Sequence, residues 1–151
     1  MLEYDFQNSV GHAVCMTAHR FERAMNEELV PQGITYRQCQ VLAWIAFEGD
    51  LSQVDLADRM NIEPASLVPV LDRMERDGFI ERVAVEGDRR RKNVRVLRKA
   101  ETLWKKIVDS AERVRTRATA GLTEQELAIL RALLGRIEQN LSEEEAAKAT
   151  A

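Results

Sequence analysis

Apolar side chains recur at intervals of three and four residues in several stretches of the chain, a spacing that predicts amphipathic helices. Two of these helices lie before residue 50, and two follow residue 98. Thr35 and Thr123 each stand three residues before a glutamine or glutamate, the capping-box spacing that marks a helix start. The predicted helices are therefore Asp5–Leu29, Thr35–Phe47, Lys99–Ala120 and a last helix that begins at Thr123.

The middle of the chain carries a different succession of elements. Two short helix patterns, Ser52–Met60 and Pro64–Asp77, are separated by a tight turn. A short apolar segment (Phe79–Val85), a charged tip (86–92) and a returning strand (94–97) follow. This order is typical of a winged helix-turn-helix, which offers one helix to the major groove of DNA and the hairpin tip to the minor groove or the backbone.

Both ends of the chain carry more apolar side chains than one small lobe can bury. The long helix from Lys99 is expected to turn inward Leu103, Ile107, Val108, Ala111 and Val114. The last helix has a strict seam at spacings of three and four, which resembles a coiled-coil contact. Pairing two chains would cover these faces and place two DNA-binding helices about one DNA turn apart. The predicted homodimer interface comprises Val10, Val14, Phe21, Leu127, Leu130, Leu134, Ile137 and Leu141.

The predicted fold class is mostly α with a small β-hairpin wing. Residues 1–33 form an N-terminal dimerisation helix and residues 34–98 the winged helix-turn-helix DNA-binding domain, while residues 99–151 form the C-terminal dimerisation helices. These boundaries separate the expected DNA-binding role from the expected dimerisation role.

Charge is distributed unevenly along the chain. The net charge is −3, yet residues 73–99 hold ten Arg and Lys against five Asp and Glu, a local charge of +5. A basic region of this kind favours double-stranded DNA as a partner, because contact with phosphate needs only local positive potential. No stretch approaches the roughly 20 apolar residues of a membrane span, and no signal-peptide pattern is present, so a cytoplasmic protein is expected.

Motifs of enzymes are missing from the sequence. It has no glycine-rich phosphate loop, no nucleophile elbow and no paired histidine and carboxylate motif, so we expect neither catalysis nor a cofactor. Cys15, which lies between His12 and His19 at helical spacing, could belong to a metal site or an activated thiol. One helix cannot easily close a tetrahedral site from these three residues, so an interface or core face is expected and no metal. Cys39 is expected in the core.

Several segments of the middle region resemble the MarR family of bacterial winged-helix regulators, and in particular its SlyA-type branch. The resemblance rests on residues 29–35 (LVPQGIT), 52–59 (SQVDLADR), 62–68 (IEPASLV), 71–82 (LDRMERDGFIER) and the wing 88–92 (DRRRK). It implies a homodimer that binds a palindromic operator, usually as a repressor. It also implies release by a small-molecule effector bound between the two lobes, although some members sense oxidants or metals instead.

Two departures from the family pattern stand out. After the wing the family usually has Leu-Thr-x-x-Gly, whereas this chain has Leu97-Arg-Lys-Ala-Glu101, so an arginine replaces the capping threonine. Pro69 lies inside the predicted recognition helix, where proline costs about 3 kcal/mol if the helix is regular. Either this helix starts late, near Ser66, or it is kinked.

The candidate DNA contacts fall in three places. Arg89, Arg90, Arg91 and Lys92 form a cationic run in the wing, and the resemblance implies that Asp88 orients an arginine while Arg90 enters the minor groove. The helix starting at Ser52 can hold a phosphate at its N-terminus. The exposed face of the recognition helix is predicted to carry Ala65, Ser66, Val68, Pro69 and Arg73.

The sequence therefore predicts a homodimeric, sequence-specific DNA-binding transcriptional regulator, with a repressor as the first expectation. A small-molecule effector is a further expected partner, with Arg20, Tyr36 and Trp44 as candidate pocket residues, although aromatic residues at helical spacing often belong to the core. The alternatives are a redox- or metal-responsive regulator of the same fold and a winged-helix module for protein–protein contact.

Overall fold

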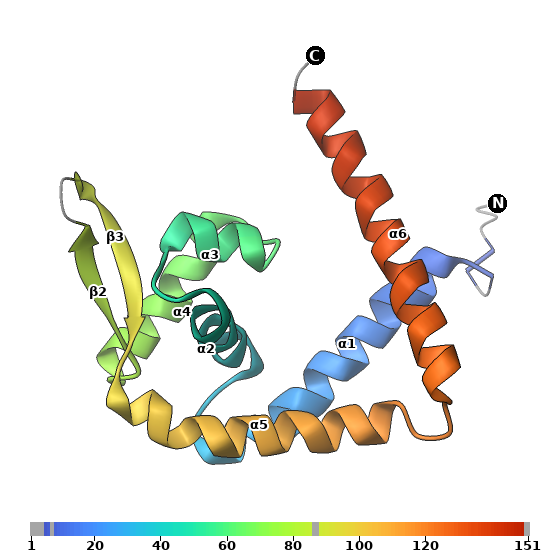
Figure 1. The fold of residues 1–151 in the computed structure, drawn as a ribbon, viewed down its shortest axis with the longest axis horizontal. Helices are drawn as coiled ribbons and strands as arrows, with labels where there is room; N and C mark the ends of the chain where they lie inside the picture. Colours follow the sequence, from blue (N-terminus) through green and yellow to red (C-terminus); the bar gives the residue numbers. More distant parts are fainter. Residues whose placement is uncertain (1–4, 7, 86–87, 150–151) are drawn as a thin grey trace. The chain divides into compact units, whose positions relative to one another are not determined.

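The computed structural model describes residues 5–6, 8–85 and 88–149, with the backbone alone at 88–91 and 143–149. It forms two compact units, Met1–Val114 and Arg115–Ala151. The helices and strands, drawn in Figure 1, are α1 (Val10–Leu29), the short 3-10 helix η1 (Val30–Gln32), α2 (Tyr36–Glu48), β1 (Leu51–Ser52), α3 (Gln53–Arg59), α4 (Pro64–Arg76), β2 (Ile80–Val85), β3 (Asp88–Val96), α5 (Arg98–Ala118) and α6 (Glu124–Ala149).

The helix starts follow local capping chemistry. The hydroxyl of Thr35 accepts a hydrogen bond from the backbone N–H of Gln38, whose side chain accepts one from the N–H of Thr35, so the capping box predicted for α2 is confirmed. Thr123 forms the same box ahead of α6. The predicted start of the first helix at Asp5 is wrong, because Ser9 caps α1 by accepting a hydrogen bond from the N–H of His12.

The recognition helix α4 begins at Pro64. Of the two alternatives predicted for Pro69, the late helix start near Ser66 is therefore wrong. Pro64 occupies the first helical position, where its lack of an N–H is harmless and its fixed φ angle favours the helix. Pro69 lies inside the helix and leaves the carbonyl of Ala65 without an intrahelical donor. Gly78 follows the helix with a φ angle of 73°, the left-handed conformation expected of a residue just past a helix end.

The wing is part of a three-stranded antiparallel sheet with the order β1-β3-β2. The predicted returning strand is longer than expected, because β3 starts at Asp88. It pairs with β2 from Ile80↔Val96 to Ala84↔Lys92, and after a register shift Val85 pairs with Asp88. The run from Arg89 to Lys92 therefore has the backbone of a strand, which corrects its placement in the tip. Strand β1 was not predicted at all, and its Leu51 pairs with Val94.

One hydrophobic core fills the first unit, and α1, α2, α3, α4, the sheet and α5 all contribute to it. Both predicted boundaries, at 33/34 and 98/99, fall inside this unit, so the division by role stays a prediction. The long helix turns Ile107 and Val114 into the core as expected. The expectation for Val108 is wrong, because its side chain is 45% exposed and Ser110 is buried in its stead.

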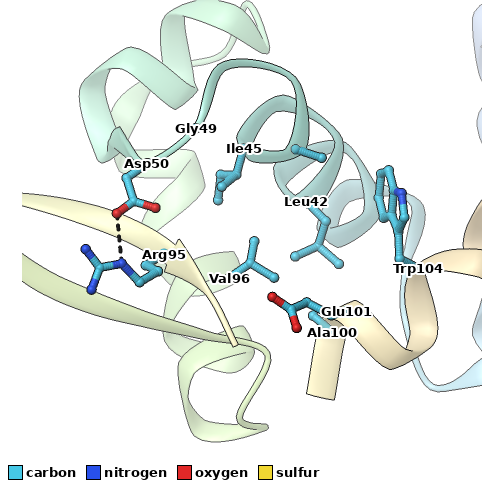
Figure 2. A pocket seen from close by; sticks show the side chains of 10 residues that line it. Leu42, Ile45, Gly49, Asp50, Arg95, Val96, Ala100, Glu101 and Trp104 are labelled. Carbon is cyan, nitrogen blue, oxygen red and sulfur yellow. Dashed lines mark hydrogen bonds and ion pairs between the residues drawn. The ribbon is translucent and has the colours of Figure 1, made fainter. Parts of the chain in front are cut away.

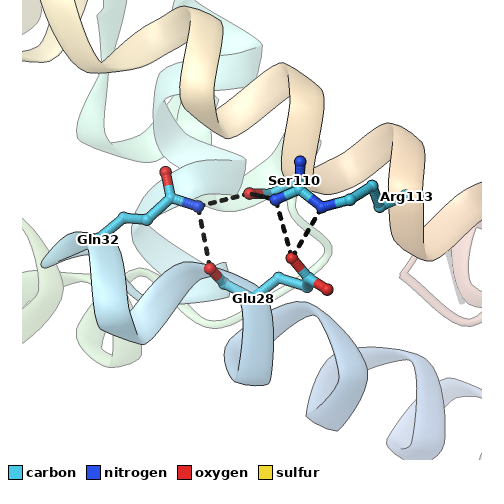
Figure 3. Close-up of polar contacts among 4 residues, drawn as sticks. All are labelled: Glu28, Gln32, Ser110 and Arg113. Atoms are coloured by element: carbon cyan, nitrogen blue, oxygen red, sulfur yellow. Dashed lines mark hydrogen bonds and ion pairs between the residues drawn. The ribbon is translucent and has the colours of Figure 1, made fainter.

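A polar cluster ties the end of α1 to α5. As Figure 3 shows, the amide of Gln32 donates to the hydroxyl of Ser110 and to the carbonyl of Glu28. Arg113 donates to the Glu28 carboxylate at 2.9 Å and to the Ser110 hydroxyl at 2.9 Å. The hydrogen bonds of Gln32 and Ser110 are partly withdrawn from water, and they link the segment that follows α1 to α5.

Arg82 joins the sheet to the recognition helix. Its guanidinium donates to Asp72 and to Glu75, both at 2.6 Å, and its backbone N–H donates to the Glu75 carboxylate at 3.1 Å. The Arg82 side chain is only 18% exposed. These charge-assisted bonds hold β2 against the last two turns of α4.

We predict that Arg82→Ala lowers the free energy of unfolding by about 1–2 kcal/mol, because two charge-assisted bonds are lost from a mostly covered side chain. Arg82→Lys should recover part of the loss, since an ammonium group cannot span both carboxylates. Urea denaturation measures all variants. The control is Arg76→Ala, whose partner Asp77 lies at 3.5 Å from a 72% exposed side chain, and which should cost less than about 0.5 kcal/mol. Equal losses in Arg82→Ala and Arg76→Ala would contradict the role of Arg82.

Candidate nucleic-acid interface

Helix α4 has one buried and one exposed face. Leu67, Leu71 and Met74 are completely buried in the core. The five residues predicted to face DNA are all exposed: Ala65, Ser66, Val68, Pro69 and Arg73. Among these five, only Ser66 and Arg73 carry side-chain hydrogen-bond donors. Such a face can approach a groove closely, and its methyl groups suit contact with thymine.

The predicted cationic run of the wing follows α4 in the sequence and belongs to strand β3. Lys92 is exposed on β3. The side chains of Asp88, Arg89, Arg90 and Arg91 lie outside the described residues, although their backbone belongs to β3. The structure thus places the predicted cationic run along one strand next to the hairpin turn.

Two further basic residues, Arg95 and Lys99, connect neighbouring elements in this part of the fold. The sequence analysis did not identify them as functional residues. Arg95 donates from Nε to the Asp50 carboxylate at 2.8 Å and has Glu81 at 3.8 Å. Lys99 donates to the carbonyl of Asp77 at 2.7 Å and lies over the ring of Phe79, 4.9 Å from its centroid. A lysine that accompanies the last carbonyls of a helix is favoured by the helix dipole. The position of Lys99 just after the wing could have indicated this contact.

Ser52 has a structural role that limits its predicted contact with phosphate. Its side chain is buried, and its hydroxyl donates to the Asp55 carboxylate at 2.6 Å while accepting from the Asp55 N–H at 3.2 Å. The carboxylate of Asp55 also brings negative charge to the N-terminus of α3. Any phosphate contact there would therefore come from the backbone, not from the Ser52 hydroxyl.

The candidate effector residues are scattered. The Tyr36 ring packs edge-on against Phe21, with 6.4 Å between the ring centroids, and burial raises the pKa of its hydroxyl. The Trp44 ring packs against Phe47, and Arg20 is exposed on α1. None of Arg20, Tyr36 and Trp44 lines the pocket of about 480 Å³ that Figure 2 shows between α2, β3 and the start of α5. That pocket contains a different tryptophan, Trp104.

The two cysteines differ in environment. Cys15 is exposed on α1, whereas Cys39 is buried in the core as predicted. Burial raises the pKa of the Cys39 thiol to about 11, so the thiol is protonated at neutral pH. Within the described residues, no three His, Cys, Asp or Glu side chains converge as a metal site would require. His12 instead contacts the ring of Phe6.

The predicted dimer interface is largely uncovered in the single chain. Val10 and Val14 are exposed on α1, while Phe21 is half-buried. On α6, Leu130, Leu134 and Leu141 are exposed, and Leu127 and Ile137 are half-buried. Two apolar residues outside the predicted seam, Ile129 and Leu133, are also exposed, so the apolar face of α6 is wider than the seam.

The comparisons with known proteins agree with this geometry. Residues 32–91, from the end of η1 into the wing, match the model of the MarR family. The winged helix-turn-helix segment of this chain is thus similar to that of the MarR family. A cysteine-to-serine variant of MarR from E. coli, solved with operator DNA, is similar to it at 26% identity and a TM-score of 0.79, over 85% of this chain and 92% of MarR. The transcriptional regulator PA3341 is 29% identical with a TM-score of 0.81, over 89% of this chain and 99% of PA3341.

A third structure shares the fold alone. CouR from Rhodococcus jostii RHA1, bound to p-coumaroyl-CoA, is 20% identical with a TM-score of 0.78, over 89% of this chain and 95% of CouR. The predicted fold class, mostly α with a winged helix-turn-helix, is thus confirmed as that of MarR-family transcriptional regulators. No helix in the described part of the chain is long and apolar enough to span a bilayer. The SlyA-type branch stays a prediction.

Thiol reactivity tests the placement of Cys39. In a Cys15→Ser variant, Cys39 is the single remaining thiol, and a colourless aromatic disulfide reagent should not label it at pH 7.5 in the native state. Its raised pKa leaves almost no thiolate, and the core excludes the reagent. In denaturant the same thiol should react fully, which serves as the control. Rapid labelling of the folded variant would show that Cys39 is not a core residue.

Proposed function

We propose that this protein is a sequence-specific transcriptional repressor that occupies a palindromic operator as a homodimer. The exposed face of α4 carries this proposal, because it lies on a rigid, core-anchored helix and is followed at once in the sequence by the basic wing. The fold shared with E. coli MarR, which was solved with operator DNA, supports it.

The chemistry of the α4 face bears on how sequence would be read. Ser66 and Arg73 can donate hydrogen bonds to base edges or phosphates, and Ala65 and Val68 can contact thymine methyl groups. So few donors favour a large share of recognition through DNA shape, with Arg90 of the wing entering a narrow minor groove. The local charge of +5 over residues 73–99 would supply the non-specific phosphate term.

The uncovered apolar side chains of α6 support the homodimer of this proposal. A single winged helix-turn-helix contacts a short half-site, and a two-fold axis doubles the contact and selects a palindrome. The exposed apolar side chains of α6 are the surface that such a dimer would cover.

Selection of bound duplexes from a random DNA pool tests the proposal. The expected result is a palindrome whose half-sites are about one helical turn apart. A protein-interaction module of the same fold would retain no duplex above background even at low salt. That result would overturn the proposed function, because the electrostatic term alone should hold DNA under those conditions.

The wing provides the first variant test. Arg90→Ala should weaken operator binding at least several-fold by removing the minor-groove contact, with the fold intact by circular dichroism. Arg91→Ala should weaken binding to all sequences alike and reduce the slope of log K against log salt by about 0.9, as expected for one lost phosphate contact. Arg136→Ala, an exposed arginine of α6, is the matched control and should change neither quantity. Unchanged affinity in Arg90→Ala would refute the wing assignment.

The apolar face of α6 provides the second variant test. Leu134→Asp should yield monomeric protein with no operator binding, because the dimer would bury an unpaired carboxylate at a cost of several kcal/mol. In the single chain Leu134 is 42% exposed, so the substitution should not unfold the monomer. Ala132→Asp adds the same charge two residues away and should leave the dimer intact in sedimentation velocity. A wild-type protein that sediments as a folded monomer would contradict the interface.

A further inference from the structure

A pocket of about 480 Å³ lies in the first unit, between the end of α2, strand β3 and the first turns of α5. This volume falls in the range of small-molecule sites, about 300–1,000 Å³. Most of its lining is apolar. The apolar lining residues include Leu42, Ile45, Val96, Ala100 and Trp104. A molecule that fills it would need a hydrophobic body.

The pocket is lined by more negative than positive side chains. Asp50 and Arg95 form an ion pair at 2.8 Å on one side, and Arg95 also has Glu81 at 3.8 Å. Glu101 lines the pocket from α5, and no ion pair or hydrogen bond to its carboxylate occurs among the residues that the structure describes. One guanidinium and two carboxylates line the pocket, which leaves one net negative charge.

Glu101 departs from the family pattern described above. It occupies the position at which the Leu-Thr-x-x-Gly pattern has glycine. In Figure 2 its carboxylate lies on the pocket side of α5, beside Val96. The sequence therefore adds a carboxylate to a pocket wall where a glycine would contribute no side chain at all.

We propose that this pocket binds a small apolar organic cation, with its ammonium group paired to Glu101 and its hydrophobic body against Leu42, Ile45 and Trp104. Because Glu101 is exposed while Leu42 and Ile45 are buried, the ammonium group would meet the carboxylate on the solvent side and the hydrophobic body would lie against the apolar lining. The indole of Trp104 offers a second favourable surface for a cation. An organic acid is disfavoured, because Arg95 is already paired and the acid would lie near Glu101.

The pocket is built so that a ligand there can reach the wing. Val96 and Arg95 belong to β3, and the bond from Arg95 to Asp50 fastens that strand to the loop after α2. A ligand that contacts both sides favours one spacing of β3 and α2 over others, and it shifts operator affinity by its difference in affinity for these states. We therefore assign the cation as the effector of the regulator, an assignment that rests on the proposed function.

Calorimetry without DNA tests the site directly. The probes are 2-naphthylmethylamine, which is protonated at pH 7, and 2-naphthoate, which has a similar ring and the opposite charge. The amine should bind at least about tenfold more tightly than the acid, since the ion pair replaces a repulsion. Glu101→Gln should weaken amine binding about five- to tenfold and abolish the preference.

Two further variants separate charge from shape. Asp109→Asn removes a negative charge from the exposed side of the same helix and should leave amine affinity unchanged. Ala46→Phe places a ring in the pocket from an exposed position of α2 and should block both probes. Equal or tighter binding of 2-naphthoate, or unchanged amine affinity in Glu101→Gln, would overturn the proposal.

The regulatory step has a separate measurement. With the operator found by selection, saturating amine should change the affinity of the wild type for DNA at least threefold and that of Glu101→Gln much less. Unaltered operator affinity at saturating amine would overturn the effector assignment. Failure to bind any operator would instead overturn the proposed function, and calorimetry would still decide whether the cation site exists.

Discussion

The burial of one face of α4 is the constraint on which the rest of the structure depends. Leu67, Leu71 and Met74 have no exposed surface, and each such side chain contributes roughly 1.5–3 kcal/mol by leaving water. Because these residues recur at helical spacing, their burial fixes the rotation of the helix about its own axis. The small and polar residues on the other side must then face outward. A surface that reads DNA is positioned by the hydrophobic residues behind it.

Hydrophobic burial fixes this rotation but not the attachment of the sheet, since it has little directional preference. The directional contacts come from charged groups around the core. Arg82 links β2 to α4, and Arg95 links β3 to the loop after α2. Lys99, on α5, donates a hydrogen bond to the carbonyl of Asp77 at the end of α4. Arg82 and Arg95 thus attach the two strands of the wing to neighbouring elements, and Lys99 attaches the start of α5 to the end of α4. The basic region 73–99, which the sequence suggests as a DNA-binding surface, therefore also contains cations that hold the fold together.

The sequence predicted the elements whose signals are local and repeated. Helical spacing located α2, α4 and α5, and the capping boxes at Thr35 and Thr123 located two helix starts to the residue. Strand β1 has two residues, too few for any alternation, and it exists because Val94 of a distant strand pairs with it. The second to fifth residues of β3, Arg89 to Lys92, are consecutive cations, so they lack the alternation that marks a strand. On either side of Arg89, Arg90 and Arg91, Asp88 pairs with Val85 and Lys92 with Ala84, so contacts with a distant strand place both ends of this stretch.

The candidate sites also differ in whether a local sequence signal or a contact between distant segments defines them. The exposed face of α4 could be read from the helix period alone, since the period assigns each residue to a face. The pocket could not, because its walls come from three elements whose contact is tertiary, and Trp104 lines it where Trp44 was expected. Yet the residue that gives the pocket its charge, Glu101, was already visible as a departure from the family pattern. A departure of this kind becomes informative only when the fold shows what the altered side chain faces. Glu101 is exposed, yet it lines a mostly apolar pocket beside the wing, so its carboxylate gives that pocket a charge that a glycine would not.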